Sequence, residues 1–371
     1  MRRIPRMAGF GAVHRVLHVV LLLAAVATSG CKSLAVRRLP DRVLPGDPLF
    51  TGQLREAYAK VRATVNLAAG TSQLARSDGY VYTVDVSQLL TYAALTGDSA
   101  LYRPLRDFAV FKLLSDTVAD PYTRGFVLWR RKEGAPPDAS GTTEGLRVAE
   151  GLWAGAEAFG DTVARSRAIL IVHGYARHGY EDQGVWLIRN YFNFQSRTFA
   201  TNSYLVDYDP DFVQLVANVT RDSALHDVAR RSNKLVRDAL TPTVLLYEVI
   251  QPEIITALPV LTTPVFSPND LVSILNTCTV AERVVQSQPD IGRGVLRFMR
   301  RHERENALYY YGRTGEPMKE DDLRLAPLAC LVRLSLKLDD RSGALRYTKE
   351  MLRHLRSVRP GGSTLDLYTT T

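Results

Sequence analysis

The feature that most constrains the fold of this chain is a short segment that recurs between helical patterns. Each copy ends an apolar helical segment and places an aspartate where the next helix begins, and two copies have a glycine before it. Glycine readily takes the left-handed conformation that ends a helix, and aspartate caps the positive end of the next one. The pattern therefore predicts helical hairpins with aspartate turns. The five turns are Leu95–Leu101, Ala158–Thr162, Val219–Leu225, Ser287–Asp290 and Lys337–Asp340.

The spacing of these turns gives the size of the repeat. Counted at their aspartates, from Asp98 to Asp339, consecutive turns lie 49 to 68 residues apart. That spacing suits two helices of about 15 residues each with their loops, and a further helix is expected near Leu54–Leu67. A hairpin cannot bury its apolar stripe alone, so the hairpins stack into an open solenoid or a closed ring. Six hairpins match an all-α (α/α)6 toroid in number and size, and we predict this closed form.

The N-terminus has the pattern of an export signal. Four arginines precede the apolar stretch Val16–Ala27, which is shorter than the roughly 20 apolar residues that span a bilayer. Small residues then lead to Gly30-Cys31, which resembles the cleavage site of a lipoprotein precursor; an ordinary cleaved signal is the alternative. We expect a signal peptide over 1–30, a linker over 31–50, a helical domain over 51–358 and a flexible tail over 359–371. Lipidated Cys31 would anchor the protein to a membrane of the cell envelope.

Two observations bear on location and partners. Lys32 and Ser33 lack the aspartate that resembles a retention signal for the inner membrane, which favours the outer membrane. The net charge of +9 includes four arginines of the expected signal, and no basic patch with interleaved aromatic residues occurs, so we expect no nucleic-acid partner.

The sequence has no CxxC or HExxH spacing and predicts no metal or cofactor. Cys278 and Cys330 either pair or are two small buried residues.

Three segments resemble glycoside hydrolase family 8, whose members hydrolyse polysaccharides on an (α/α)6 barrel. Tyr82–Asp98 is similar to the first inner helix of that family, which begins near a catalytic glutamate. Gly141–Asp161 is similar to the second signature, an acidic start followed by an alanine-rich helix, and Asn202–Ala217 to the third segment. The resemblance implies a two-carboxylate inverting hydrolase, or another member of the six-hairpin glycosidase group, acting on a β-glucan, a chitosan-like polymer or an exopolysaccharide.

Four acidic residues are the catalytic candidates, because each precedes an aspartate turn by about one helix. They are Asp85, Glu144, Asp207 and Asp209. In a toroid the inner helices run in the same direction, so these acids would gather at one mouth of the ring. We assign Glu144 as the general acid, with Gly145 leaving room for substrate, and Asp85 as the group that activates water; family precedent would reverse the two. Asp207 or Asp209 is a third acid. The alternative is that each acid only caps its helix.

Aromatic and polar residues near the same helix starts are candidates for sugar binding, since sugar rings pack on aromatic faces. The long loop 190–202 adds polar side chains, and loops carry function disproportionately. The alternative is that the aromatic residues belong to the core and that the loop is a structural plug. The candidates are Tyr80, Tyr82, Trp129, Arg197, Asn202, Tyr204 and Tyr208.

Departures from the family motifs support two other functions. Val84-Asp85-Val86 stands where the family has Ser-Glu-Gly, and Thr143-Glu144-Gly145 stands where it has two aspartates. These changes fit an inactive lipoprotein that binds polysaccharide or a secretion partner. An esterase or a lyase is the second alternative: Ala168–Gly174 reads like the first core strand of an α/β-hydrolase, although no GxSxG follows. A lyase would use Tyr80 or His173 as base.

Overall fold

The computed structural model describes residues 74–76, 78–117, 120–250, 270–305, 307–318 and 325–357. The expected signal peptide, Cys31, the linker, the helix near Leu54–Leu67 and the tail lie outside these ranges. Within them, no helix is both long and apolar enough to cross a membrane.

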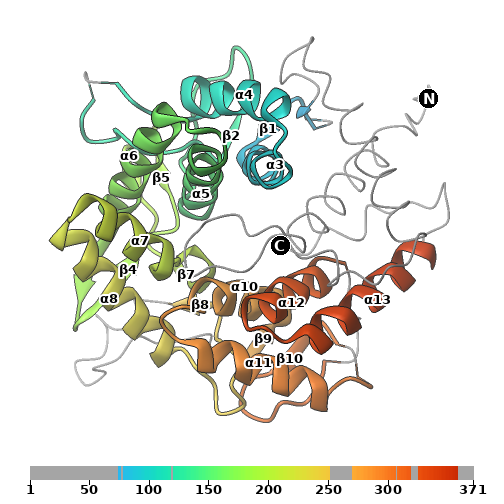
Figure 1. The fold of residues 1–371 in the computed structure, drawn as a ribbon. Helices are drawn as coiled ribbons and strands as arrows, with labels where there is room; N and C mark the ends of the chain where they lie inside the picture. The colour runs from blue at the N-terminus through green and yellow to red at the C-terminus, as the bar shows by residue number, and fades with distance from the viewer. Residues whose placement is uncertain are drawn as a thin grey trace, which may run out of the picture.

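Five helical hairpins follow one another along the described chain. In Figure 1 they form an arc from α3 through α8 to α13, with one helix of each pair on the inside. The inner helices are α3 (Thr83–Thr96), α5 (Thr142–Phe159), α7 (Pro210–Thr220), α10 (Ile274–Arg283) and α12 (Leu325–Lys337). Their outer partners are α4 (Ser99–Phe108), which continues as the π-helix η2 (Ala109–Leu113), then α6 (Thr162–His178), α8 (Ser223–Asp238), α11 (Pro289–Arg301) and α13 (Arg341–Ser357).

Short antiparallel pairs of strands connect the hairpins, so the chain is predominantly but not wholly helical. A short 3-10 turn, η3 (Leu205–Asp207), precedes α7. The pairs are β1 (Val81–Tyr82) with β2 (Arg130–Arg131), β3 (Gly179–Asp182) with β4 (Val185–Ile188), β5 (Phe192–Asn193) with β6 (Thr198–Phe199), β7 (Ser203–Tyr204) with β8 (Val249–Ile250), and β9 (Leu271–Ser273) with β10 (Tyr309–Tyr311).

Three of the aspartate turns have the predicted chemistry. Asp98, Asp161 and Asp222 each accept a backbone hydrogen bond from the first turn of the following helix, at 2.8–3.1 Å. Gly97 and Gly160 end the preceding helices in the left-handed conformation, with φ of 71° and 68°. These contacts satisfy backbone groups that a helix end would otherwise leave unpaired.

The last two turns correct the prediction. Asp290 lies inside the first turn of α11, where it pairs with Arg237, and Gln288 occupies the capping position. In the fifth turn the cap is Asp340, which accepts a hydrogen bond from the Gly343 amide at 3.1 Å. Asp339 instead takes a left-handed φ of 57°, the role that glycine has in the first two turns.

The inner helices pack closely because their facing residues are small or apolar. A methyl group on Gly151 of α5 would lie 2.8 Å from the Leu90 Cβ of α3, so glycine lets these two helices approach. Between α10 and α12, Cys278 and Cys330 are buried free thiols. Their burial fits the prediction of small core residues rather than that of a disulfide.

Candidate active site at the starts of the inner helices

Residues 127–131 tie together the starts of α3 and α5. The Thr83 amide donates to the Trp129 carbonyl at 3.0 Å, and the Gly141 amide donates to the Val127 carbonyl at 3.0 Å. Strand β2 of this segment also pairs with β1, which leads directly into α3. The helix starts that carry Asp85 and Glu144 therefore share one connecting segment, with Trp129 between them.

Asp85 is fully buried and its carboxylate is occupied. Arg76 donates from Nε and Nη2 to its two oxygens, each at 3.1 Å, in the forked geometry of a strong ion pair. The guanidinium of Arg76 also lies over the Tyr82 ring, 4.0 Å from its centre. Both oxygens of this carboxylate are therefore engaged by Arg76.

Glu144 has a different environment in the first turn of α5. It is partly exposed, and no residue in the described ranges forms a hydrogen bond or ion pair with its carboxylate. The side chain folds back over the chain at Gly141, where an added methyl group would collide with the carboxylate and lie 3.2 Å from the Trp129 Cβ. Gly145, expected to face the substrate, is instead buried against Val127 and Ile171.

Asp207 lies at the end of η3 and is buried, with 1% of its surface exposed. Thr143, the neighbour of Glu144, donates a hydrogen bond to its Oδ1. Its Oδ2 is buried and has no hydrogen-bond partner in the part of the chain described. Burial, reinforced by the charge of Glu144, raises the pKa of Asp207 to about 7. Thr143 therefore links Asp207 to the start of α5, where its neighbour Glu144 has a carboxyl group of different character.

Asp209 has a structural role. It caps α7 by accepting a hydrogen bond from the Phe212 amide at 3.0 Å, and Arg283 of α10 lies 3.5 Å from its other oxygen. Burial and the neighbouring carboxyl group of Glu150 raise its pKa well above the usual value. The capping alternative thus describes Asp209, whereas it does not describe Glu144 or Asp207.

Three of the aromatic candidates gather beside the start of α3. Tyr82 and Trp129 meet edge to face with ring centres 5.5 Å apart, and the Arg130 guanidinium lies 4.1 Å from the Tyr80 ring centre and 4.2 Å from that of Trp129. Trp129 donates from Nε1 to Asp138 at 2.9 Å. The rings are partly exposed and held together, and Trp129 lies near Glu144, because a methyl group added at Gly141 would contact both the Glu144 carboxylate and the Trp129 Cβ.

Tyr208 and Arg197 differ from the sequence prediction. Tyr208 is buried, and its hydroxyl accepts a hydrogen bond from the Ile188 amide at 2.8 Å, so its ring and hydroxyl belong to the core rather than to a sugar-binding surface. Arg197 is exposed and donates to both oxygens of Asp120, at 2.9 and 3.2 Å. Tyr204 lies in β7, directly before η3, and stays partly exposed.

The strand expected for an esterase does not form. Residues 168–174 lie inside α6, so that interpretation of the segment is wrong. His173, the candidate base of a lyase, lies on α6 with its Nδ1 3.8 Å from Asp222 Oδ2.

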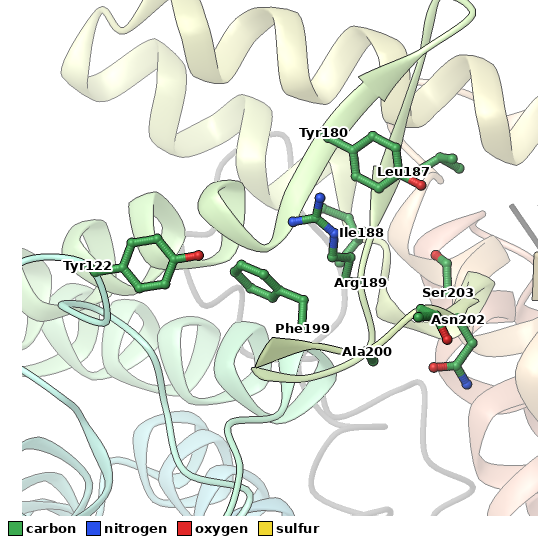
Figure 2. A pocket seen from close by; sticks show the side chains of 10 residues that line it. Tyr122, Tyr180, Leu187, Ile188, Arg189, Phe199, Ala200, Asn202 and Ser203 are labelled. Carbon is green, nitrogen blue, oxygen red and sulfur yellow. The ribbon is translucent and has the colours of Figure 1, made fainter. Parts of the chain in front are cut away.

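A pocket has a volume of about 550 Å³ (Figure 2). Most of its lining residues come from the part of the sequence directly before η3 and Asp207. Of the predicted residues it includes Asn202, and the remaining wall was not predicted, because Tyr180, Arg189 and Phe199 are brought together only by the strand pairs β3–β4 and β5–β6. The density of aromatic and polar residues in loop 190–202 was the one signal for it. The lining residues are Tyr122, Tyr180, Leu187, Ile188, Arg189, Phe199, Ala200, Thr201, Asn202 and Ser203.

Comparisons with solved structures identify the fold. An alpha-amylase from Clostridium perfringens superposes with a TM-score of 0.64 at 13% identity, covering 79% of this chain and 84% of that one. Rex8A from Paenibacillus barcinonensis, complexed with xylose, gives 0.54 at 16% identity, covering 73% and 75%. An endo-β-1,4-glucanase of family 8 from an Achatina fulica gut metagenomic library gives 0.55 at 11%, covering 73% and 88%.

No family model matches the sequence, and neither does any curated protein. At these low identities the structural likeness concerns the fold alone. It confirms the resemblance to the six-hairpin glycosidases, family 8 included, and the prediction of an (α/α)6 toroid.

Proposed function

We propose that this chain is a cell-envelope glycoside hydrolase that cleaves a polysaccharide with Glu144 and Asp207 as its two carboxyl groups. The observation that carries the proposal is the contrast between two acids joined through Thr143: the Glu144 carboxylate is without a hydrogen-bond partner in the described chain, and Asp207, which accepts from Thr143, is buried with a pKa of about 7. Glycoside hydrolysis needs one carboxyl group that holds a proton and one that is charged.

The roles follow from that contrast. Asp207 holds its proton near neutral pH and gives it to the leaving glycosidic oxygen, and Glu144 takes a proton from the attacking water. The bond from the anomeric carbon to the leaving oxygen breaks while a bond to the water oxygen forms on the opposite face, which inverts the configuration. Asp207 thereby takes the general-acid role that the sequence assigned to Glu144, and Glu144 takes the water-activating role that the sequence assigned to Asp85, whose carboxylate Arg76 occupies.

The substrate class rests on the site and on the neighbours. Tyr80, Tyr82 and Trp129 form a cluster of partly exposed rings, with Trp129 near Glu144, and such rings suit the apolar faces of sugars. The similar structures include complexes with xylose and with an arabinofuranosyl-xylotetraose, and an endo-β-1,4-glucanase. We propose a polysaccharide of the same general kind: a β-glucan, a chitosan-like polymer or an exopolysaccharide.

A non-catalytic, polysaccharide-binding lipoprotein is the second candidate. The observation in its favour is the ion pair between Arg76 and Asp85, at the position where the resemblance places a catalytic glutamate. Binding would use the same aromatic residues and the same fold. Its placement in the envelope rests, as for the hydrolase, on the signal and on Cys31, which remain proposals.

The test is release of reducing ends from a panel of polysaccharides by the purified chain and by Glu144→Gln and Asp207→Asn. Each variant should lower the rate at least about 100-fold, because each removes a proton-transfer group. Glu157→Gln is the matched control, since Glu157 lies on the same helix and pairs at its surface with Arg165. Full activity of Glu144→Gln would remove this residue from the mechanism. Binding without hydrolysis across the panel would favour the second candidate.

A further inference from the structure

Arg189 is the one charged residue among those that line the pocket of Figure 2. It follows β4, and its backbone amide donates to the carbonyl of His178 at 3.2 Å, which fixes the base of the side chain. Its guanidinium lies between two rings, 4.6 Å from the centre of Tyr180 and 4.7 Å from that of Phe199. In Figure 2 it extends toward the side of the pocket where Tyr122 lies.

Among the described residues, no neighbouring acid compensates the positive charge of Arg189. No carboxylate in the described ranges forms an ion pair with it. Two acids of neighbouring segments pair with other arginines: Glu181 of β3 lies 2.9 Å from Arg231, and Asp120 lies 2.9 Å from Arg197. Burial holds the pKa of the adjacent His178 at about 3, so that ring stays neutral, and the additional charge near it is that of Arg177.

We propose that this pocket binds an acidic sugar unit, a uronic acid residue of the polysaccharide. A planar guanidinium donates two parallel hydrogen bonds to a carboxylate, and stacking on Tyr180 and Phe199 holds it ready to do so. The exposed face of Tyr122 offers an apolar surface for the sugar ring across the pocket. A neutral sugar would leave the guanidinium without an anionic partner in a partly desolvated site.

The pocket is connected to the proposed active site through the backbone. The Asn190 amide donates to the Asn202 carbonyl at 3.0 Å, and the Thr142 hydroxyl at the start of α5 donates to the Asn190 carbonyl at 2.7 Å. Strand β7, which follows Asn202, leads directly into η3 and Asp207. The pocket at Arg189 would thus be one subsite for the polymer on which the proposed hydrolase acts, and it would hold a uronic acid unit of that polymer. This assignment of the ligand class rests on the proposed function.

Equilibrium binding tests the inference without turnover. Full-length protein carrying Glu144→Gln is titrated with an oligogalacturonate and with a neutral cello-oligosaccharide of the same length. The acidic ligand should bind at least about tenfold more tightly, the ratio expected from one charge-assisted hydrogen-bonding pair. Added salt should reduce the ratio, because it screens the attraction. A sulfated oligosaccharide in a third titration shows whether the carboxylate or any anion is recognised.

Substitutions locate the effect. Arg189→Gln should abolish the preference, and Arg189→Lys should retain only part of it, because lysine keeps the charge but not the planar fork. Arg230→Gln is the control, since Arg230 is exposed and pairs with Asp227 three residues before it. Equal affinity for acidic and neutral ligands, or an unchanged preference in Arg189→Gln, would overturn the inference. If Arg189→Gln fails to fold, the salt dependence of binding to the unsubstituted pocket decides the same question.

The outcomes separate this inference from the proposed function. Hydrolysis of a neutral polymer with no preference for oligogalacturonate would leave the hydrolase standing and refute the acidic subsite. Tight, Arg189-dependent binding of oligogalacturonate with no hydrolysis by the unsubstituted chain would do the reverse.

Discussion

Two poorly exposed carboxyl groups near the inner helices have pKa values that are shifted in opposite directions. Asp207 at the start of the site has a pKa raised to about 7, whereas Glu282 near the end of α10 has a pKa lowered to about 2. Burial opposes the charged form of both. The difference lies in the partners: Arg333 lies 2.9 Å and Lys337 lies 3.2 Å from the oxygens of Glu282. Asp207 accepts a hydrogen bond from a neutral threonine and has no ion pair in the described chain; burial and the charge of Glu144 raise its pKa more than the charge of Arg283 lowers it.

This contrast distinguishes a structural acid from a candidate catalytic one within the same fold. Glu282 joins α10 to α12 and is compensated by two cations, as expected for a group that holds helices together. Asp207 has an unpartnered oxygen and a raised pKa, which costs stability and is the kind of arrangement found where a proton must be transferred. The charged and hydrogen-bonding partners of a carboxyl group, more than how deeply it is buried, therefore indicate whether its role is structural or catalytic.

The largest effect is expected in the pH dependence of stability from Asp207. Because its folded-state pKa lies above the unfolded value near 4, the folded state holds the proton more tightly, and stability is lost as pH rises from about 4 to about 7. Asp207→Asn does not ionise and escapes this loss. Urea unfolding at a series of pH values should show the variant gaining up to about 4 kcal/mol relative to the unsubstituted chain over that range. A constant difference across the range would show that Asp207 does not titrate there.

Glu282→Gln should change stability in the opposite direction: it should lower the free energy of unfolding rather than raise it. Removing this carboxylate leaves Arg333 and Lys337 without their anion, which should lower the free energy of unfolding at pH 7 by about 3 kcal/mol. The figure is at the low end for buried pairs because Lys337 keeps 32% of its side chain exposed. Since the pKa of Glu282 is depressed, this contribution should fade as pH falls from about 4.5 to about 2. A loss below about 0.5 kcal/mol at pH 7, in the same urea titrations, would show that the pair is only a surface contact.

The fold could be predicted from the sequence because its determinants are local. Asp98, Asp161 and Asp222 bond to amides two or three residues ahead, and Gly97 and Gly160 end helices by their own backbone freedom. The prediction failed by one or two residues at Asp290 and Asp339. In those turns several polar residues compete for the cap, and tertiary contacts such as the Arg237 pair decide.

The site was predictable only in part because its determinants are not local. The sequence places Glu144 and Asp85 at helix starts, but the pairing of Arg76 with Asp85 depends on how the chain turns before β1. The contact between Thr143 and Asp207 joins residues far apart in the sequence. In the sequence, Tyr208 cannot be distinguished from an exposed aromatic residue. Its place in the core depends on the contact between its hydroxyl and the Ile188 amide.

The smallest expected effect concerns the position of Glu144 rather than its chemistry. Gly141→Ala fits the local backbone, where φ is −126°, but its methyl group would displace the Glu144 carboxylate and press on the Trp129 Cβ at 3.2 Å. A shift of that size in a proton-transfer group should lower kcat about tenfold, because the geometry of attack is lost while the residue remains. The free energy of unfolding should change by less than about 1 kcal/mol, since only the end of a flexible side chain has to move. Gly145→Ala is the matched control: its methyl group would meet only Val127 and Ile171, at the ordinary distances of 3.7–3.8 Å, and should leave kcat unchanged. Equal effects of the two alanines on kcat would mean that the placement of the Glu144 carboxylate over Gly141 has no part in the reaction.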